Sequence, residues 1–499
     1  MKLLCVTSIR WMLLWVGVAA AAGAVSAQVP ARSPDRILAG TITRADHQHY
    51  RDVPFIVPRG TTRLVIAFDH DGRDQKTVID LGVRDARGFR GASGGNKAEL
   101  TISASDATPA YLAGRIAPGR WLLALAVPNI RAGVTAHWRA RLWFLKPGEP
   151  SPAAPVVDRG PGWYRGDLHL HSAHSDGVCA SQSGAKVPCP LVKTLEAASA
   201  RGLDFIAITD HNTVSQLDAA RALQPLFDRL LLIPGQEVTT FFGHFNVFGV
   251  SEPIDFRIGA GGRSFAATVD RVHALGGLVS INHPALPSGE ICMGCGWAMP
   301  GPAAIGVDAI EAVNGGAWRA GGTPDGAFSG IGFWARAVAD APVTAIGGSD
   351  NHDATQPGET PGAIGRPTTV VEASALTQQA ILDGIRRGRV FVDMDAGAGS
   401  LLDVVATSVA VEGRMGETIS APAGTGFDVT VTVRLRGHYR VELIVNDQRV
   451  GDRFFDEAGH LSVRIAPPSG RSIIRPVVRT AEGRLVLLGN AIRIDVARP

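Results

Sequence analysis

The pattern of apolar and polar positions divides the chain into three regions. Residues 28 to about 155 contain short apolar or alternating runs, such as 62–68 and 121–127, separated by Gly, Pro and Asp turns. No long stretch in this region has a helical period. The pattern predicts a β-sandwich, followed by a Pro-rich linker over residues 146–155.

The second region, residues 160–396, alternates short β-like runs with segments of helical period. Candidate helices lie at 191–201 and 265–275. The β-like runs lie at 167–170, 205–209, 230–233, 245–250, 278–281, 309–313 and 343–346. This alternation predicts a mainly parallel sheet, closed as a barrel, with functional residues at the carboxyl ends of the strands.

From residue 400 to residue 499 the pattern returns to strict alternation, as in 427–435 and 441–445. We expect a second, immunoglobulin-like β-sandwich here. The predicted fold is therefore an α/β barrel flanked by N-terminal and C-terminal β-sandwich domains. The length of 499 residues agrees with three domains of roughly 150 residues each.

Composition and the N-terminal pattern predict where the protein is located and argue against nucleic acid as a partner. The formal net charge is only +3, which indicates no broad nucleic-acid surface. Lys2 and Arg10 precede an apolar stretch that ends in small residues, which predicts a signal peptide cleaved after Ala27 and a periplasmic or secreted protein. The alternative is an uncleaved anchor, but the strongly apolar part is shorter than the roughly 20 residues that span a bilayer. No later segment is predicted to span a membrane.

Four cysteines would remain after cleavage: Cys179, Cys189, Cys292 and Cys295. An even number in an oxidising compartment favours two disulfides, whose pairing the sequence leaves open. Two alternatives apply to the Cys292–Cys295 motif. It could be half of a four-thiolate zinc site, although the spacing of Cys179 and Cys189 is too wide for the usual pattern, or it could be a redox pair.

The most informative segment is residues 166–177, which contains His169, His171 and Asp176. Residues two apart in a strand face the same way, so the two histidines are expected to point together while the leucines beside them pack on the other face. Gly177 lets the chain reverse, which places Asp176 just beyond the strand end.

Histidines and carboxylates recur at the ends of the other predicted strands. They are His211 after 206–209, Glu237 after 230–233, His244 before 245–250, His283 after 278–282, and Asp350 and His352 after 343–348. Together with the first segment they make six His, two Asp and one Glu, which suit Zn²⁺, Mn²⁺ or Fe²⁺ and are too many for one ion.

Several neighbours of these residues are further candidates. Asp210, beside His211, could orient an imidazole or accept a proton, and a helix N-cap is the equal alternative. His174, in the first loop, is a candidate proton shuttle. Glu311 and Asn314 lie at another strand end, where Glu311 could line the pocket or have a structural role.

The motifs H-x-H-x-x-x-S-D-G, T-D-H, G-x-E, N-H-P and G-S-D-x-H, read in order, resemble those of the PHP (polymerase and histidinol phosphatase) metallohydrolases. The expected export, the flanking β domains and residues 380–392 are similar to the CehA/McbA branch, which includes carbaryl hydrolases. The resemblance implies a distorted (β/α)7 barrel with two or three divalent metal ions, Mn, Zn or Fe.

The resemblance also implies three ligand sets. The first ion would be held by His169, His171, Glu237 and Asp350, the second by Glu237, His244 and His283, and the third by Asp176, His211 and His352. Family members that use a histidine as the last ligand of the first motif differ from this chain, which has Asp176 there. This harder ligand favours manganese or iron over zinc.

The expected chemistry is hydrolysis by a metal-bound hydroxide acting on a small-molecule ester. A phosphoesterase is the first hypothesis, and a carbamate or aryl carboxylic ester hydrolase at the same site is the alternative. A non-enzymatic, metal-stabilised envelope binding protein is the third hypothesis, although a structural zinc needs only four ligands. A phosphate-binding Gly-rich loop and a nucleophile elbow are both missing from the site segments, which argues against an NTPase and a serine hydrolase. The sequence leaves the oligomeric state open.

Overall fold

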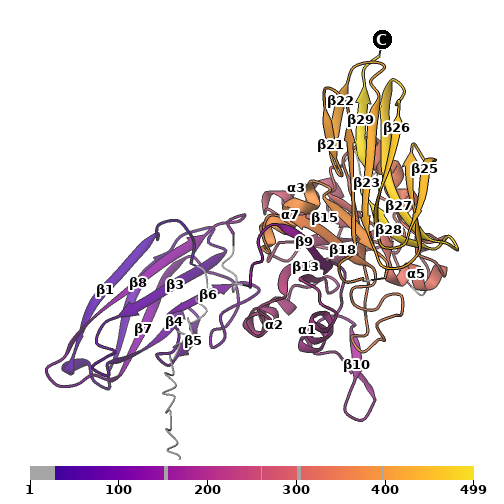
Figure 1. The fold of residues 1–499 in the computed structure, drawn as a ribbon. Helices are drawn as coiled ribbons and strands as arrows, with labels where there is room; N and C mark the ends of the chain where they lie inside the picture. The colour runs from indigo at the N-terminus through magenta and orange to yellow at the C-terminus, as the bar shows by residue number, and fades with distance from the viewer. Residues whose placement is uncertain are drawn as a thin grey trace, which may run out of the picture.

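The computed structural model describes residues 29–150, 156–259, 261–290, 292–299, 305–395 and 397–498. The predicted signal peptide and the second half of the predicted linker lie outside these residues. The chain is a mixed α/β protein with much β-sheet and few helices (Figure 1). Among the described helices, none combines the length and the apolar character needed to cross a membrane.

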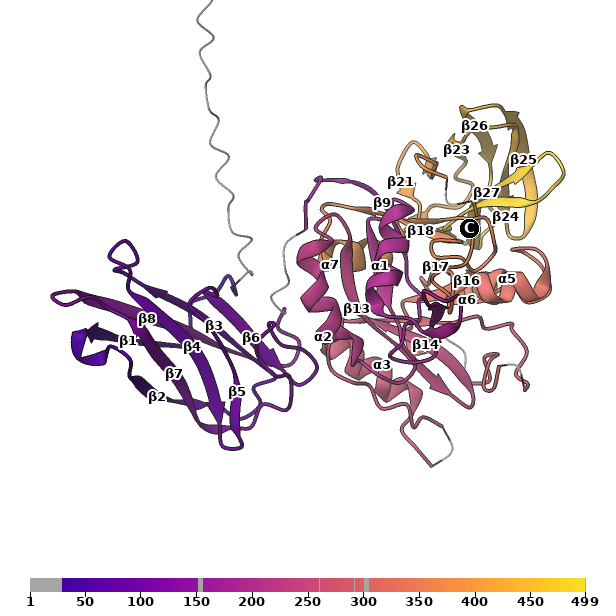
Figure 2. The same ribbon diagram turned by 90° about the horizontal axis from the view of Figure 1, so that it is seen from below.

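The N-terminal region consists of two sheets of four strands each, with the order β1-β8-β3-β6 and β2-β7-β4-β5 (Figure 2). Alternate residues of both sheets, including Trp121 and Trp138, are buried in one apolar core. The elements are β1 (Arg36–Thr43), the 3-10 helix η1 (Arg44–Asp46), β2 (Tyr50–Val57), β3 (Arg63–His70), β4 (Val78–Asp85), β5 (Gly88–Ser93), β6 (Glu99–Ser103), β7 (Gly119–Asn129) and β8 (Thr135–Leu145).

The central region contains one curved sheet with helices on its outside (Figure 2). Its strands are β9 (Gly162–Asp167), β12 (Phe205–Ile208), β13 (Leu231–Thr240), β14 (Gly243–Phe248), β15 (Leu278–Ile281), β16 (Ala309–Asn314), β17 (Thr344–Gly348), β18 (Thr368–Ala373) and β19 (Val390–Asp393). The helices are α1 (Leu191–Ala200), α2 (Gln216–Leu223), η2 (Gln224–Leu226), α3 (Phe265–Ala274), α5 (Gly315–Gly321), α6 (Ile331–Asp340) and α7 (Gln378–Arg386). A small hairpin of β10 (Val178–Ala180) and β11 (Lys186–Pro188) projects from it.

The central sheet is mixed, where the sequence predicted a mainly parallel one. Strands β9, β12 and β13 are parallel, as are β15, β16 and β17. Strand β14, however, is antiparallel to both β13 and β15. The reason is that β13 extends to Thr240, well past the predicted run, and a two-residue connection then turns the chain straight into β14.

The segments that follow β9 and β17 also meet. Leu170 and Asn351 form a parallel bridge. The amide of Asp350 donates to the carbonyl of His169 (2.9 Å), and the amide of His171 donates to the carbonyl of Asn351 (3.0 Å). The carboxyl ends of the outermost parallel strands therefore lie side by side, where the predicted ligands are concentrated.

The C-terminal region is a second pair of packed sheets around one apolar core. One sheet has the order β21-β20-β23-β26, and the other joins the central sheet because β28 pairs with β19. Its strands are β20 (Leu401–Thr407), β21 (Glu412–Arg414), β22 (Thr418–Ala421), β23 (Phe427–Arg434), β24 (Tyr439–Val445), β25 (Gln448–Phe455), β26 (Ala458–Ile465), β27 (Gly470–Thr480), β28 (Leu485–Gly489) and β29 (Ile492–Val496).

Candidate metal centre

The first motif lies just beyond a strand rather than within one. Strand β9 ends at Asp167, so His169 and His171 occupy the extended segment that follows. Leu168 and Leu170 are fully buried in apolar clusters, which leaves the two histidines on the opposite side of the chain, as alternation predicts. The carboxylate of Asp167 accepts hydrogen bonds from the amides of His169 (3.2 Å) and Ser349 (3.0 Å) and thereby holds the segment in place.

Glu237 is the centre of the cluster. It lies inside β13 and is fully buried. Five imidazole nitrogens surround its carboxylate at 2.9 to 3.5 Å. They are His169 Nε2, His171 Nε2 and His211 Nδ1 around Oε2, and His244 Nδ1 and His283 Nε2 around Oε1. One carboxylate thus faces ligand atoms from four separate segments of the chain.

Asp350 approaches the same two histidines from the other side. Its Oδ1 lies 3.3 Å from His169 Nε2 and 3.2 Å from His171 Nε2. Asp350 has a φ of 54° and His283 has a φ of 27°, a left-handed backbone that non-glycine residues rarely adopt. Such backbone strain is concentrated at functional sites, where the surrounding structure maintains it.

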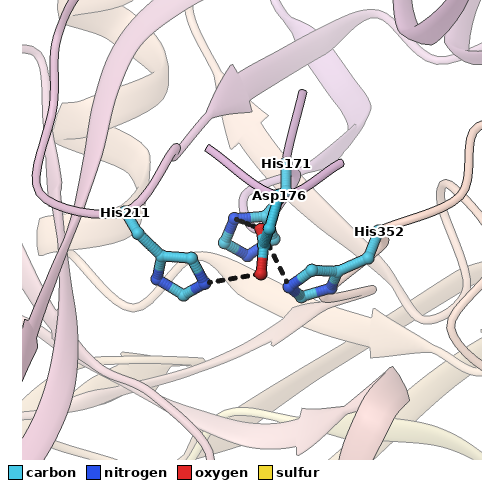
Figure 3. A group of neighbouring side chains, drawn as sticks. All are labelled: His171, Asp176, His211 and His352. Carbon is cyan, nitrogen blue, oxygen red and sulfur yellow. Dashed lines mark ion pairs between the residues drawn. The ribbon is translucent and has the colours of Figure 1, made fainter. Parts of the chain in front are cut away.

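A second, more open group surrounds Asp176, whose side chain is 56% exposed (Figure 3). Its carboxylate lies 3.5 Å from His352 Nε2, 3.7 Å from His211 Nε2 and 3.8 Å from His171 Nδ1. Gly177 is required here for space, because a Cβ on it would lie 2.6 Å from the carbonyl of His171. The φ of Gly177 is not positive. The glycine is therefore needed for this close approach of the two backbone segments, and not for an unusual backbone conformation as expected.

The structure brings all nine predicted ligands together. Their ligand atoms form four overlapping groups, within each of which the atoms lie no more than 4.8 Å apart. The groups are His169, His171 and Glu237; His169, His283 and Asp350; Glu237, His244 and His283; and His171, Asp176, His211 and His352. These sets resemble the three that the family resemblance implies, except that His171 also reaches the Asp176 group and His283 also reaches Asp350.

The residues fit a cluster of divalent cations. Four buried atoms in the centre have no hydrogen-bond partner, namely His169 Nε2, His171 Nδ1, Glu237 Oε2 and His283 Nδ1. Leaving such atoms unpaired costs about 1–3 kcal/mol each, so native structures rarely do so without a ligand or ion to satisfy them. Imidazole nitrogens and carboxylate oxygens are a donor set for zinc, manganese and iron.

The charged groups of the cluster shift the pKa values of one another. Burial disfavours the charged form of His169, but Glu311, Asp350 and Glu237 outweigh it and raise the pKa of this imidazole well above its ordinary value. The same histidine holds the pKa of Glu237 well below the ordinary value, against the effect of burial. Burial and the neighbouring His352 lower the pKa of His171 to about 4, whereas Asp176 and Asp350 overcome burial and raise the pKa of His352 to about 9.

Other buried side chains orient these ligands. Glu311 accepts hydrogen bonds from His169 Nδ1 (2.6 Å), the His283 amide (3.0 Å) and Asn314 Nδ2 (2.9 Å). Two further contacts involve residues that sequence reasoning did not identify: Thr239 Oγ1 lies 2.7 Å from His211 Nδ1, and the Asn282 amide donates to Glu237 Oε1 (2.9 Å). Thr239 could have been found from the alternation in β13, because it lies two residues after Glu237 and faces the same side.

Asp210 has contacts other than those predicted, whereas the role of His174 stays a prediction. Buried Asp210 accepts hydrogen bonds from the Ser172 amide (2.8 Å), the Ser172 hydroxyl (2.7 Å) and the Ser175 hydroxyl (2.6 Å). It therefore holds the first loop instead of orienting an imidazole, and it caps no helix because α2 begins only at Gln216. His174 is exposed, and its Nδ1 lies 2.8 Å from Ser215 Oγ.

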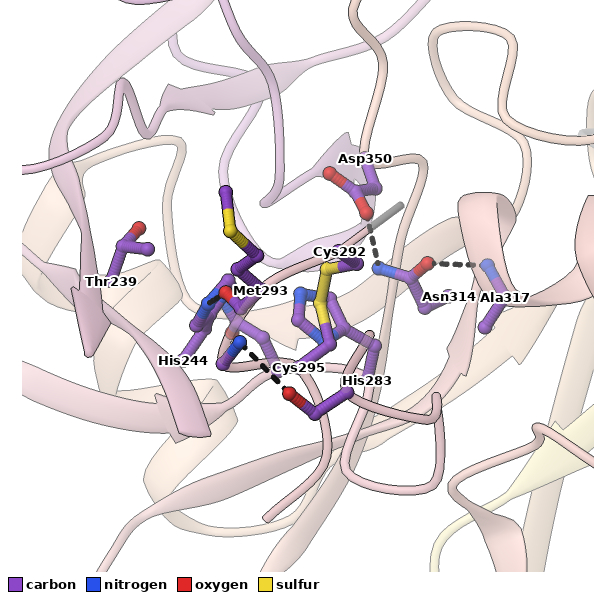
Figure 4. Close-up of a disulfide and its surroundings, with 12 residues drawn as sticks. Thr239, His244, His283, Cys292, Met293, Cys295, Asn314, Ala317 and Asp350 are labelled. Atoms are coloured by element: carbon purple, nitrogen blue, oxygen red, sulfur yellow. Dashed lines mark hydrogen bonds between the residues drawn. A yellow bond between two sulfur atoms is a disulfide. The ribbon is translucent and has the colours of Figure 1, made fainter. Parts of the chain in front are cut away.

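The four cysteines form two local pairs, Cys179–Cys189 and Cys292–Cys295. This pairing agrees with the two predicted disulfides and differs from the four-thiolate zinc site. The first disulfide closes the β10–β11 hairpin, directly after the loop that carries Asp176. The second lies beside His244 and His283 (Figure 4).

No protein-family model and no curated protein matches the chain. Among solved structures, it is similar to a two-domain protein from Bacteroides vulgatus that contains a predicted PHP-like metal-dependent phosphoesterase (18% identity, TM-score 0.36, covering 69% of this chain and 99% of that chain). It is also similar to a protein from Bifidobacterium adolescentis with an inferred metal-dependent phosphoesterase activity (17% identity, TM-score 0.28, covering 38% and 89%). These likenesses are too distant to assign a function.

Proposed function

We propose that the chain is a metal-dependent hydrolase of the PHP type, and that its substrate is a phosphoric ester. The observation that carries this proposal is that His169, His171, Glu237 and His283, which belong to overlapping groups of candidate ligands, each have a buried atom without a hydrogen-bond partner. A cluster with only a structural role would satisfy these atoms internally. The distorted (β/α)7 barrel that the motifs imply belongs to the same proposal.

The nine predicted ligands would hold two or three ions, with Glu237 shared between neighbouring sets. When bound, divalent ions polarise a substrate oxygen and lower the pKa of water toward neutrality. The protein's own residues supply the geometry. Glu311 holds His169 by its Nδ1 so that Nε2 points to Glu237 and Asp350, and Asp210 holds the loop that carries Asp176.

Exposure indicates the side from which a substrate reaches the centre. The side chains of His169 and His171 are fully buried, whereas those of His211, His352 and Asp176 are 27%, 36% and 56% exposed. A substrate would therefore enter past the Asp176 group. Three divalent ions carry more positive charge than the carboxylates of Glu237, Asp350, Asp176 and Glu311 neutralise, so an anionic phosphate would be attracted to this side.

A carbamate or aryl ester hydrolase is the second candidate, and one observation favours it. Two large apolar side chains are exposed on segments next to His244: Phe241, three residues before it, which is 90% exposed, and Met293, which is 77% exposed. Phe241 precedes β14, and the carbonyl of Met293 lies 3.2 Å from His244 Nε2. Apolar groups at the edge of a polar centre suit a substrate with an aromatic leaving group.

The test compares p-nitrophenyl phosphate esters with 1-naphthyl N-methylcarbamate on the protein loaded with Mn²⁺, each with and without a chelator. Turnover that prefers phosphate and stops with chelator is the expected result. A preference for the carbamate would support the second candidate, and it would direct attention to Phe241 and Met293. Turnover that survives complete metal removal would contradict both proposals.

Export to the periplasm or the exterior is part of the proposal. It is supported by the N-terminal sequence pattern and by two disulfides, which persist in oxidising compartments. N-terminal sequencing of the protein recovered from a periplasmic extract should begin at Gln28. Recovery of the uncleaved chain in the membrane fraction would contradict it.

A further inference from the structure

The Cys292–Cys295 pair lies against one of the proposed metal ligands. Cys295 is buried and Cys292 is half-buried, and a sulfur of each lies within 4.8 Å of the other and of a ring nitrogen of His244 (Figure 4). Two cysteines separated by two residues, together with a histidine, are a familiar ligand set for zinc. The cysteine pair and the candidate metal centre therefore share the same imidazole as a neighbour.

His244 stands between the two sets of groups. Its Nδ1 lies 3.3 Å from Glu237 Oε1, in the metal centre. Its Nε2 lies 3.2 Å from the carbonyl of Met293, within the cysteine loop. A carbonyl can only accept a hydrogen bond, so Nε2 carries the proton and Nδ1 keeps a free lone pair on the Glu237 side. The loop that contains the disulfide thus selects the tautomer that serves the centre.

The loop is fixed to its surroundings between the two cysteines and just after them. The amide of Gly294 donates to Ser288 Oγ (3.0 Å), and the amide of Trp297 donates to the carbonyl of Pro284 (3.0 Å). Gly294 has a φ of 81°, and a Cβ on it would lie 2.0 Å from the carbonyl of Thr240, so only glycine fits. These contacts do not involve the sulfur atoms and would keep both cysteines beside His244 after reduction.

We propose that Cys292, Cys295 and His244 form a redox-dependent metal site, an inference that rests on the proposed function of the centre. With the disulfide intact, His244 Nδ1 faces Glu237 and is available as a ligand of the proposed metal centre. A dithiol reductant transfers two electrons and two protons, so that the S–S bond breaks, two thiols form and the reductant becomes a disulfide. The thiols then release two protons as they bind Zn²⁺ together with His244, which withdraws this ligand from the centre.

The half-buried Cys292 is the sulfur that a reductant can reach, because Cys295 is only 1% exposed. Attack on Cys292 releases Cys295 as the leaving thiolate, inside the site beside His244. The Cys179–Cys189 pair has no such neighbour among the groups of candidate ligands in the described residues. It therefore provides a matched control within the same chain.

The test uses the full chain, freed of metal and titrated with Co²⁺ in two states: as isolated, and after reduction with a phosphine that is then removed under anaerobic conditions. Peptide mapping verifies which cysteines are reduced. We expect a thiolate-to-cobalt charge-transfer band in the near ultraviolet only in the reduced protein. The band should be lost when Cys292→Ser is combined with Cys295→Ser, and retained when Cys179→Ser is combined with Cys189→Ser.

Three results would overturn the inference: resistance of Cys292–Cys295 to reduction in the folded protein, a reduced protein without the band, or a band that persists in the Cys292→Ser, Cys295→Ser variant. The readout is independent of turnover. A protein without chelator-sensitive turnover but with the band would contradict the proposed function alone, and chelator-sensitive turnover without the band would contradict only the redox-dependent site.

Discussion

Two groups of buried charges in this protein are built in opposite ways. In the N-terminal sandwich, Asp106 is buried and accepts hydrogen bonds from Arg63 through both carboxylate oxygens, at 2.9 and 2.5 Å. Arg221 of α2 and the hydroxyl of Ser103 also donate to it. The metal centre has equally buried groups, yet several of its ligand atoms have no hydrogen-bond partner.

The difference shows that burial of charge does not by itself mark a functional site. Burial alone raises the pKa of Asp106, but Arg221 and Arg63 outweigh it and hold the pKa well below the ordinary value. The ionised carboxylate is thus fully compensated by the protein, and the group joins the sandwich to α2. In the centre, several buried ligand atoms have no hydrogen-bond partner among the described residues, which is the arrangement expected of a cation site.

The largest expected effect is on turnover. We expect His169→Ala to lower kcat/KM by at least about a thousandfold, or ~4 kcal/mol, because it removes a ligand shared by two of the four groups. His273→Ala is the matched control. This histidine lies in α3, and its Nε2 contacts Asp308 at 2.8 Å. Equal activity of the two variants would contradict the proposed centre.

The next effect is on folding. Asp106→Ala leaves Arg63 and Arg221 without their shared carboxylate, and breaking a buried ion pair typically costs about 3–5 kcal/mol. We expect a loss of this size in the free energy of unfolding, measured by urea denaturation, with an unchanged metal content. Asp428→Ala, in an exposed pair with Arg464, should change stability little. If Asp106→Ala also lost metal, the conclusion that the Asp106 group has only a structural role would be wrong.

A smaller effect is expected from a residue that only orients a ligand. Glu311→Gln should weaken Mn²⁺ binding about 10- to 100-fold, the usual cost of losing an orienting partner of a ligand histidine. Isothermal titration calorimetry measures this affinity. Glu372→Gln, at an ion pair with Arg389 outside the groups of candidate ligands, is the control and should bind as the unaltered chain does. Retained affinity in Glu311→Gln would show that His169 is held by its other contacts.

The two groups should respond to pH in different ranges, one above neutrality and the other in acid. A metal needs neutral imidazole, and the pKa of His352 is about 9 without metal, so metal affinity should rise between pH 7 and 9 by less than about tenfold per pH unit. The pKa of Asp106 is depressed by folding, so its contribution to stability is complete above the ordinary value of about 3.9 and is lost as the pH falls below it.

Calorimetry in buffers of different ionisation enthalpy measures the protons that metal binding releases, and acid titration of the unaltered chain against Asp106→Ala measures the second effect. An affinity that falls from pH 7 to 9 would contradict the first prediction. A difference in stability between the two proteins that stays constant below pH 4 would contradict the second.

The nine candidate ligands were predictable because their signal is local. Each is a histidine or carboxylate next to, or within, a short apolar run, and a β-rich alternating pattern brings the ends of such runs together. Strand limits were less predictable. β9 ends before the first motif because the carboxylate of Asp167 and the backbone of residues 349–351 hold that segment, and both depend on contacts far along the chain.

The sequence by itself determined the kinds of ligand and their approximate positions on the strands, since both follow from residue type and local periodicity. Only the tertiary structure decided which atoms face one another. His169 contacts Glu311, which is 142 residues further along the chain. Asp210 accepts hydrogen bonds from the first loop and not from an imidazole. The pairing of the cysteines and their place beside His244 were decided in the same way, because they depend on how distant segments pack around one centre.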